Sequence, residues 1–434
     1  MTIAASDIDI YDPAVGDDPY PTYRILRDHF PVFRDEKMVG NLYAHNQMGK
    51  GPRFLITRHA DIGAILKDPQ RFSSQRWGTI PDDQPQPTRE TYRGNLVGDD
   101  APRHTMLRGI LQKTLTRPVV MSLDPPIRAQ VRALLEAIPA SGEVDLAKAV
   151  AVPLPIWVIA RLLGVPEGDM ERFRKWAFSG HPRHWHMWWE ENVGPVNAVT
   201  AEELEKQRVT ALGEFYAYFD ERVGARMAEP QDDLISVLVN GQKEVGDKAF
   251  TRQELLQLLH LLLLGGNETT TNLISIFMKR AAEDPALWQA LRADRKLMDK
   301  AIEELIRWEG PVQSVGRRVA EDVELHGVKI PAQSSLVLLI GAANRDDRVF
   351  PNPDTYDLTR SPNPHLGFGT GVHFCLGAPV ARLEMGIVLN ELLDRYSSVE
   401  PAGTARLAGT APQGILSESR RLRGYGHLPL RFKA

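Results

Sequence analysis

One cysteine, Cys375, occurs among the 434 residues, and it lies within a glycine-rich stretch. Gly367, Gly369, Gly371 and Gly377 surround it, and glycine allows a backbone to turn tightly or to approach a flat cofactor closely. After the cysteine the apolar residues take helical spacing, which places the sulfur just before a helix N-terminus. The N–H groups and the positive dipole of that terminus favour the thiolate, which is the form that binds a metal. The sequence therefore predicts that Cys375 is a metal ligand.

A lone thiolate limits which metal centre the protein can hold. A structural zinc site needs four ligands, and an iron–sulfur cluster bound by the protein needs several cysteines. A haem needs only one axial thiolate. The cysteine count therefore favours a haem, and the alternative is a buried structural cysteine in a glycine-rich turn.

The second element with chemical character is the run of residues 251–283, whose apolar residues keep helical spacing for about nine turns. Its polar residues argue against a membrane span, so we expect a long buried helix. Gly265 and Gly266 in its middle cost roughly 1 kcal/mol each relative to alanine, which indicates that something approaches the backbone there. Thr269 can hydrogen-bond back to the preceding turn, and Glu268 places an acid beside it.

The stretch around the cysteine resembles the signature of the cytochrome P450 family, Phe-x-x-Gly-x-His-x-Cys-x-Gly, which is matched by Phe368, Gly371, His373, Cys375 and Gly377. The middle of the long helix resembles the same family's oxygen-activation element, Ala/Gly-Gly-x-Asp/Glu-Thr. The resemblance spans nearly the whole chain in the right order. It implies a mainly helical fold with a smaller β part, formed as a single domain over residues 1–434, with haem b as the cofactor.

The resemblance also implies roles for individual residues. Cys375 would be the axial ligand of the haem iron, and the other residues placed at the cofactor are His104, Arg108, Arg317, His373, Phe368, Gly369 and Gly377. His104 and Arg108 are four residues apart, hence on one helix face, and with Arg317 and His373 they would hold the two haem propionates. Thr269 would orient dioxygen or water, and Glu268 would relay protons.

Residues 297–309 are expected to form a helix in which Glu304 and Arg307 share a face. The pair matches the family's Glu-x-x-Arg element, and residues 356–360 match the segment that supplies a second arginine. The resemblance implies a buried charge network that holds the cysteine loop in place. Between these segments, residues 316–330 are expected to form a hairpin and residues 335–340 another strand.

Several segments keep open interpretations. The sequence assigns no role to residues 36–51, which are rich in glycine and asparagine. The aromatic run at residues 176–189 corresponds to the family's mobile lid over the substrate, but packing between two helices explains it equally well. Residues 76–100 and the turn at 413–416 correspond to regions that approach the substrate in the family, and an ordinary surface loop is the alternative for the first of them.

The composition, 43% hydrophobic and 25% charged, is typical of a globular protein with an ample core. A net charge of −4 provides no basic field, so we expect no nucleic-acid partner. The first residues carry neither a secretory signal nor a membrane anchor, and a lone cysteine is consistent with a reducing compartment. We therefore expect a cytoplasmic protein, and a monomer.

The function implied by the resemblance is a monooxygenase that inserts one oxygen atom from O2 into a small-to-medium apolar substrate. The residues show no flavin or iron–sulfur signature, so electrons would come from a separate ferredoxin and an NAD(P)H-dependent ferredoxin reductase. One alternative is a peroxygenase driven by hydrogen peroxide, although proton delivery by Glu268 and Thr269 would then be unnecessary. A haem-binding sensor that catalyses no reaction is the non-enzymatic alternative.

Overall fold

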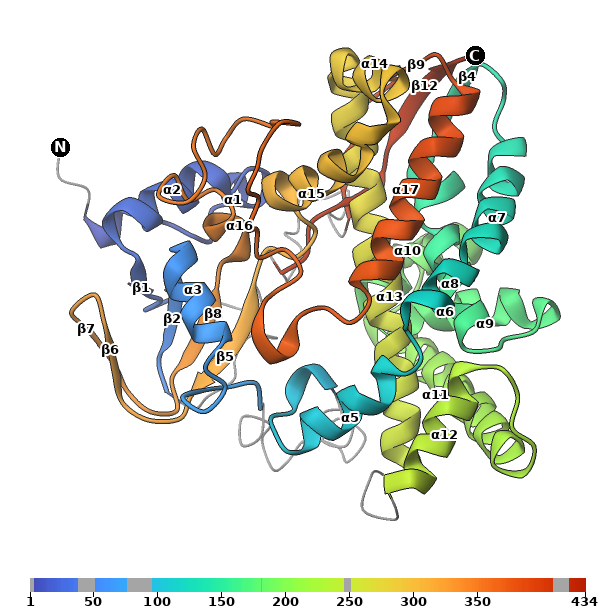
Figure 1. Ribbon diagram of the computed structural model, residues 1–434, viewed down its shortest axis with the longest axis horizontal. Helices are drawn as coiled ribbons and strands as arrows, with labels where there is room; N and C mark the ends of the chain where they lie inside the picture. Colours follow the sequence, from blue (N-terminus) through green and yellow to red (C-terminus); the bar gives the residue numbers. More distant parts are fainter. Residues whose placement is uncertain (1–3, 38–50, 76–95, 181, 246–250, 409–420) are drawn as a thin grey trace.

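A computed structural model describes residues 4–37, 51–75, 96–180, 182–245, 251–408 and 421–434. Most strands lie on one side of the molecule with the first helices, and most of the remaining helices lie on the other (Figure 1). The fold is therefore mainly helical with a smaller β part, as the sequence predicts. The helices are α1 Pro13–Asp17, α2 Tyr20–His29, α3 His59–Leu66, α5 Arg103–Gln112, α6 Arg117–Ser122, α7 Asp124–Glu136, α8 Pro153–Leu162, α9 Met170–Ser179, α10 Pro182–Asn192, α11 Ala201–Ala228, α12 Leu234–Val245, α13 Arg252–Glu283, α14 Pro285–Ala293, α15 Met298–Glu309, α16 Ile340–Ala343 and α17 Ala378–Arg395.

The largest sheet has the strand order β1-β2-β8-β5-β3, in which β2 and β8 are parallel and the other pairs are antiparallel. Smaller sheets are formed by β4, β12 and β9, by β6 and β7, and by β10 and β11. The strands are β1 Val32–Arg34, β2 Arg53–Ile56, β3 Phe72–Ser73, β4 Gly142–Asp145, β5 Val315–Val319, β6 Val323–Leu325, β7 Val328–Ile330, β8 Ser335–Leu338, β9 Ser398–Pro401, β10 Arg406–Leu407, β11 Tyr425–His427 and β12 Pro429–Lys433.

The expected hairpin over residues 316–330 is wrong in its first half. Only β6 and β7 pair with each other, whereas β5 pairs with β8 and β3 in the large sheet. The alternating pattern runs on through residues 316–330, but a period of two identifies a strand and not its partner. The buried residues of β5 are covered by joining the large sheet, and the partly buried strands β6 and β7 form a separate two-stranded ribbon.

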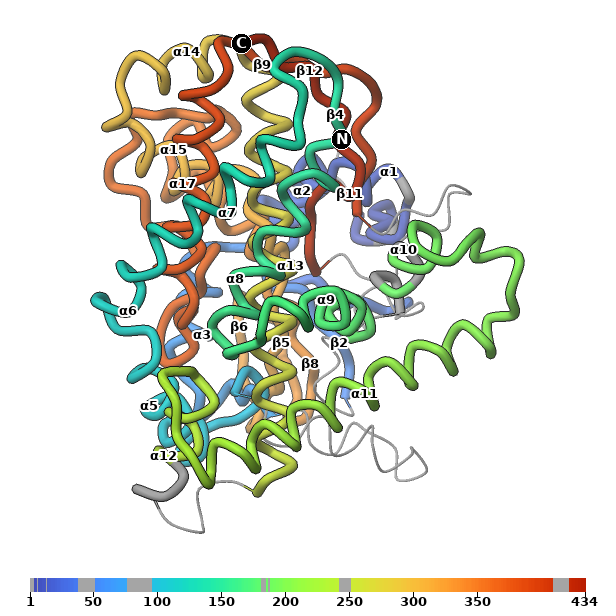
Figure 2. Tube along the Cα trace, turned by 90° about the vertical axis from the view of Figure 1, so that its right-hand side faces the viewer, coloured from blue at the N-terminus to red at the C-terminus, as the bar shows by residue number. Residues whose placement is uncertain are grey.

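Helix α13 runs the length of the helical part in both views (Figures 1 and 2). It begins with a capping box, because Thr251 Oγ1 accepts from Glu254 N at 3.2 Å and Glu254 Oε2 accepts from Thr251 N at 2.7 Å. It packs against α8, α9, α11, α14, α15 and α17. The long buried helix expected at residues 251–283 is therefore confirmed.

Part of the aromatic run belongs to the core. Trp176 and Trp185 are 0% and 1% exposed and pack with Phe215 and Phe219 of α11 in one apolar cluster. The indole Nε1 of Trp176 donates to Glu214 Oε2 at 3.1 Å. These contacts favour the packing interpretation over the lid for these two tryptophans.

Two segments named from the sequence fall partly or wholly outside the described residues: residues 36–51, to which the sequence assigns no role, and the turn at 413–416. Most of the segment at 76–100 lies outside them as well. Within the described ranges, every helix is either too short or too polar to cross a membrane.

Candidate functional site

A cavity of about 370 Å³ lies between the middle of α13, the loop before α17, strand β5 and helix α5. Most of its lining is apolar, and leucine, isoleucine and valine side chains predominate. Every residue expected at the cofactor lines this cavity, together with one of the two expected catalytic residues; these are Cys375, His104, Arg108, Arg317, His373, Phe368, Gly369, Gly377 and Thr269. The structure thus brings together residues that are up to 273 positions apart (377 − 104) in the chain.

The loop that carries Cys375 is shaped by glycine and by backbone hydrogen bonds. Gly371 has φ +70°, and a side chain there would lie 2.7 Å from the backbone oxygen of Leu66 in α3. The N–H of Cys375 donates to Phe368 O at 2.9 Å and closes the loop. Helix α17 begins directly afterwards with Gly377 as its N-cap, so the sulfur lies at a helix N-terminus as predicted.

The electrostatics of Cys375 differ from the sequence expectation. Burial raises the pKa of its thiol, and the N–H groups of Gly377 and Ala378, which hydrogen-bond to the sulfur, lower it only in part. The helix terminus alone therefore does not make the thiolate the favoured form. The sequence alone did not indicate that the sulfur is buried beside an apolar cavity, which disfavours the charged thiolate. A cation bound at the sulfur would supply the missing stabilisation, as metals do for cysteine ligands.

Two histidines and two arginines gather at one end of the cavity. The ring centroids of His104 and His373 are 4.1 Å apart, and His373 Nε2 lies 3.0 Å from Ser74 Oγ. Burial, followed by the charges of Arg317, the His104 ring and Arg108, lowers the pKa of His373 to about 3. Burial, together with the Arg108 charge, also lowers the pKa of His104. Both imidazoles are therefore neutral near pH 7 and the cluster carries the charge of its arginines.

This cluster fits a carboxylate-bearing cofactor. His104 is 2% exposed, and its Nε2 has no hydrogen-bond partner in the described part of the chain. A buried ring nitrogen of this kind requires a partner. Carboxylates pair well with guanidinium groups and accept from a neutral imidazole N–H. The donor set therefore matches the two propionates of a haem.

Helix α13 forms the wall across from the cysteine loop. Gly265 lines the cavity, and a side chain at this position would meet no atom within 4 Å. Thr269 Oγ1 donates to Gly265 O at 2.8 Å, as its position in the helix predicts. Thr270 also lines the cavity, whereas Glu268 is partly buried and lies outside the lining. The structure thus places Thr269 at the cavity and Glu268 outside its lining.

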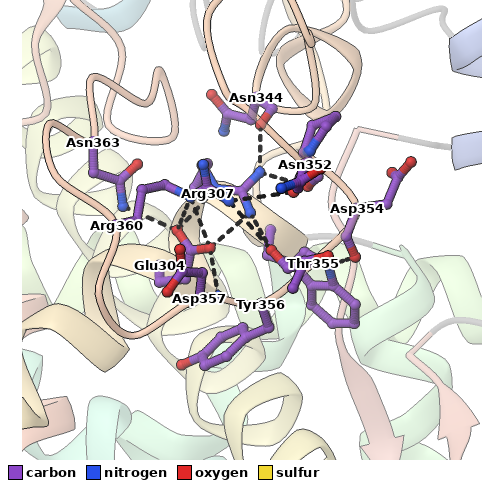
Figure 3. Close-up of polar contacts among 12 residues, drawn as sticks. Glu304, Arg307, Asn344, Asn352, Asp354, Thr355, Tyr356, Asp357, Arg360 and Asn363 are labelled. Carbon is purple, nitrogen blue, oxygen red and sulfur yellow. Dashed lines mark hydrogen bonds and ion pairs between the residues drawn. The ribbon is translucent and has the colours of Figure 1, made fainter.

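A buried charge network supports the segment that leads to the cysteine loop (Figure 3). Glu304 accepts from Arg307 Nη2 at 2.7 Å and from Arg360 Nε at 3.0 Å. It also accepts from the backbone N–H of Asp357 at 2.9 Å and from Asn363 Nδ2 at 3.2 Å. Glu304 and Arg307 are each 1% exposed. The expected network of Glu304 with two arginines is therefore confirmed.

The neighbouring residue, Glu303, fixes the loop from its other end. Arg382 of α17 donates to it through Nε at 2.6 Å, and His365 Nε2 lies 3.1 Å from it. Burial raises the pKa of Glu303, but the hydrogen bonds from Arg382 and His365 outweigh burial and hold it at about 2. Helix α15 thus anchors both the start of the cysteine loop and the first turns of α17.

Sequence reasoning missed two charged residues in the cavity wall. Glu384 follows Cys375 by nine residues, and its place on the cavity face of α17 could have been found from the helical spacing of Val380 and Ala381. Arg421 follows the turn at 413–416 and belongs to no recognisable motif. Val312 and Val315 also line the cavity. Ser314 is buried outside the lining.

Comparisons with known proteins agree with this geometry. A family model described as cytochrome P450 matches residues 195–421. The cytochrome P450 monooxygenase PikC of Streptomyces venezuelae is 35% identical over 419 residues, which are 96% of this chain and 91% of that protein. The mycinamicin IV hydroxylase/epoxidase of Micromonospora griseorubida is 37% identical over 380 residues, 87% of this chain and 89% of that protein. The crystal structure of CYP109E1 from Bacillus megaterium in complex with testosterone aligns with a TM-score of 0.79 and 31% identity. The alignment covers 98% of this chain and 100% of that chain. The chain belongs to the cytochrome P450 family.

Proposed function

We propose that the protein is a haem-thiolate monooxygenase that acts on an apolar organic substrate with electrons from a separate ferredoxin and its NAD(P)H-dependent reductase. Proteins of this family bind haem b, and the relatives named above are a monooxygenase and a hydroxylase/epoxidase. The observation that carries the proposal is that one cavity is lined by Cys375, by Thr269 and by the cluster of His104, Arg108, Arg317 and His373.

We assign the cofactor contacts as follows. Cys375 would bind the haem iron, and His104, Arg108, Arg317 and His373 would hold the propionates, while Phe368, Gly369 and Gly377 line the cavity beside Cys375. The bound haem would supply the activation of dioxygen: with two electrons and two protons, one oxygen atom would enter the substrate and the other would leave as water. The thiolate is the electron-rich ligand that favours cleavage of the O–O bond.

Thr269 and Glu268 are proposed to move protons. With its own proton donated to Gly265 O, the Thr269 hydroxyl presents oxygen lone pairs toward the cavity and can accept a hydrogen bond from water. Rotation of the hydroxyl breaks the bond to Gly265 and lets Thr269 donate into the cavity instead. Glu268, one residue earlier and partly buried, can take up a proton from solvent and pass it to Thr269 through water.

The electron donor is proposed to approach the face that carries the cysteine loop and the region around α5 and α6. Lys113 and Arg117 are exposed there, and an acidic ferredoxin would complement them. Arg103 is a weaker candidate, because its Nη2 lies 2.8 Å from Glu254 Oε1 and its Nε lies 3.4 Å from Asp99 Oδ2.

The substrate is proposed to be small to medium in size and mainly apolar, because the lining of the cavity is mainly apolar. The bound testosterone in the Bacillus megaterium relative is consistent with such a ligand. We also propose that residues 1–434 form a single domain, since α13 contributes residues to both large apolar clusters. We further propose that the protein is a monomer.

The test is reconstitution of the purified protein with a ferredoxin, a reductase and a ligand that changes the visible spectrum of the haem. We expect product when NADH and dioxygen are supplied, and much less product when hydrogen peroxide replaces them. Equal or greater turnover with peroxide would support a peroxygenase instead. Ligand binding without turnover under either condition would support a sensor.

A further inference from the structure

Ser74 connects the large sheet to the histidine of the cysteine loop. It directly follows β3, which pairs with β5, whereas His373 belongs to the loop before α17. Ser74 is 0% exposed, and its Oγ lies 3.0 Å from His373 Nε2. Ser74 Oγ has no other hydrogen-bond partner in the described part of the chain. One hydrogen bond thus joins two parts of the site that are 299 residues apart in the chain.

This hydrogen bond determines which nitrogen of His373 carries the ring proton. A buried hydroxyl group needs an acceptor for its proton. Among the described residues, His373 Nε2 is the acceptor within reach of the Ser74 hydroxyl, so the hydroxyl donates and Nε2 accepts. An imidazole that accepts through one nitrogen carries its proton on the other. The proton of His373 therefore lies on Nδ1.

The other nitrogen, Nδ1, remains for a ligand in the cavity. His373 lines the cavity together with His104, Arg108 and Arg317, and the two histidine rings lie 4.1 Å apart between centroids. An N–H beside two guanidinium groups suits a carboxylate, which accepts hydrogen bonds only. A bare Nδ1 would instead present its lone pair to the carboxylate oxygens. The hydrogen bond from Ser74 thus decides whether His373 can contribute to binding a carboxylate.

Asp100 fixes the position of Ser74. Its Oδ1 accepts from Ser74 N at 3.0 Å, and its Oδ2 accepts from Ser73 Oγ at 2.5 Å. The backbone oxygen of Asp100 accepts from His104 N at 2.9 Å, at the start of α5. One residue therefore holds both the serine that contacts His373 and the helical turn that carries His104.

We propose that Ser74 is a positioning residue for the cofactor: it holds the His373 ring with the proton on Nδ1, so that this N–H donates to a haem propionate. Asp100 in turn holds Ser74. The inference rests on the proposed function and extends it to two residues that lie outside the cavity lining. A partner on the far nitrogen of an imidazole sets both its tautomer and its orientation, as it does for histidines that bind metals.

The experiment measures how fast the protein releases haem and haem dimethyl ester. Both propionates are uncharged in the ester, so they accept more weakly from the His373 N–H. Wild type, Ser74→Ala and Ser275→Ala are loaded with each compound, and its transfer to excess apomyoglobin is followed in the visible spectrum. Ser275 is the matched control, because it is 0% exposed, donates to Asn272 O at 2.9 Å and lies outside the cavity lining.

We expect Ser74→Ala to release haem about 3- to 10-fold faster than wild type, the change that corresponds to one net hydrogen bond. Release of the ester should be accelerated less than about twofold by the same substitution, because the charged acceptor is missing. Ser275→Ala should resemble wild type with both compounds. A merely structural role of Ser74 would accelerate the release of both compounds equally. That result, or unchanged release of haem, would overturn the inference.

A double-mutant cycle with His373→Phe tests whether Ser74 acts through the histidine. Phenylalanine has no N–H, so adding Ser74→Ala to His373→Phe should change haem release by less than about twofold. An acceleration as large as in the wild-type background would overturn the inference. A wild-type chain that binds no haem would instead overturn the proposed function, and this inference with it.

Discussion

Replacement of Glu304 by glutamine tests whether the buried charge network holds the protein and its cysteine loop together. Glu304 Oε1 accepts from Arg307 Nη2, Arg360 Nε and Asp357 N at 2.7, 3.0 and 2.9 Å. Its Oε2 accepts from Arg307 Nε, Asn363 Nδ2 and Arg360 Nε at 2.8, 3.2 and 3.1 Å. Each oxygen therefore faces three donors, so the amide of glutamine opposes N–H groups in either orientation.

The expected cost follows from burial and charge. Removal of one partner from a buried ion pair typically lowers the free energy of unfolding by about 3–5 kcal/mol, because the remaining charge stays buried without compensation. Glu304→Gln leaves the two cations of Arg307 and Arg360, whose side chains are 0% and 7% exposed. Such a loss is a large part of the roughly 5–15 kcal/mol that stabilises a typical protein.

The matched control is Glu283→Gln at the end of α13. Glu283 forms an exposed i, i+4 pair with Lys279 at 2.6 Å, and pairs of this kind contribute about 0.5 kcal/mol or less. Both variants are unfolded in urea and followed by circular dichroism and by haem absorption. We expect Glu304→Gln to unfold at much lower urea and to release haem earlier. A Glu304→Gln variant as stable as Glu283→Gln would refute the reasoning.

Three further predictions concern the site and its surroundings. Thr269→Ala should consume NADH and dioxygen but release peroxide, and Glu268→Gln should lower turnover by about 10²- to 10⁴-fold. Parallel assays of NADH oxidised, peroxide released and product formed test both variants. Full coupling in Thr269→Ala, or the full rate in Glu268→Gln, would contradict the respective prediction. Charge reversal of Lys113 and Arg117 should slow reduction by the ferredoxin more at low salt than at high salt, because exposed charges are screened beyond about 10 Å at 0.1 M salt; equal rates at low salt would contradict the proposed face. Burial, with the Arg208 charge nearby, lowers the pKa of His260 to about 4. The imidazole of His260 therefore takes up a proton near pH 6.5 in the unfolded chain but not in the folded one. This group should lower the free energy of unfolding by up to about 3 kcal/mol between pH 6.5 and pH 4, and unfolding measurements on His260→Leu should show a pH dependence that is smaller by this amount.

The elements that are defined by local periodicity could be predicted from the sequence. The long helix α13 was recognisable because apolar spacing persists over its whole length, and Thr269 makes the predicted bond to Gly265. The Glu304 and Arg307 pair was recognisable from its i, i+3 spacing together with the family resemblance. These features depend on residues that are close in the chain.

The features that depend on distant neighbours could not be predicted. The partners of β5 are β8 and β3, and nothing in the alternation of β5 itself identifies them. The sulfur of Cys375 was expected to be acidic at its helix terminus, but the apolar surroundings that raise its pKa come from several other segments. Arg421 could not be placed at the cavity, because its position depends on backbone pairing with Gln313.

The most direct test of the whole account is the visible spectrum of the reduced carbon-monoxide complex of the Cys375→Ser variant. Cys375 is the only cysteine of the chain and lines the cavity together with His104, Arg108, Arg317 and His373. We expect wild type to show the spectrum of a haem with a thiolate ligand, and Cys375→Ser to lose it while circular dichroism shows an intact fold. A Cys375→Ser variant that keeps the wild-type spectrum would contradict the assignment of the axial ligand and the function built on it.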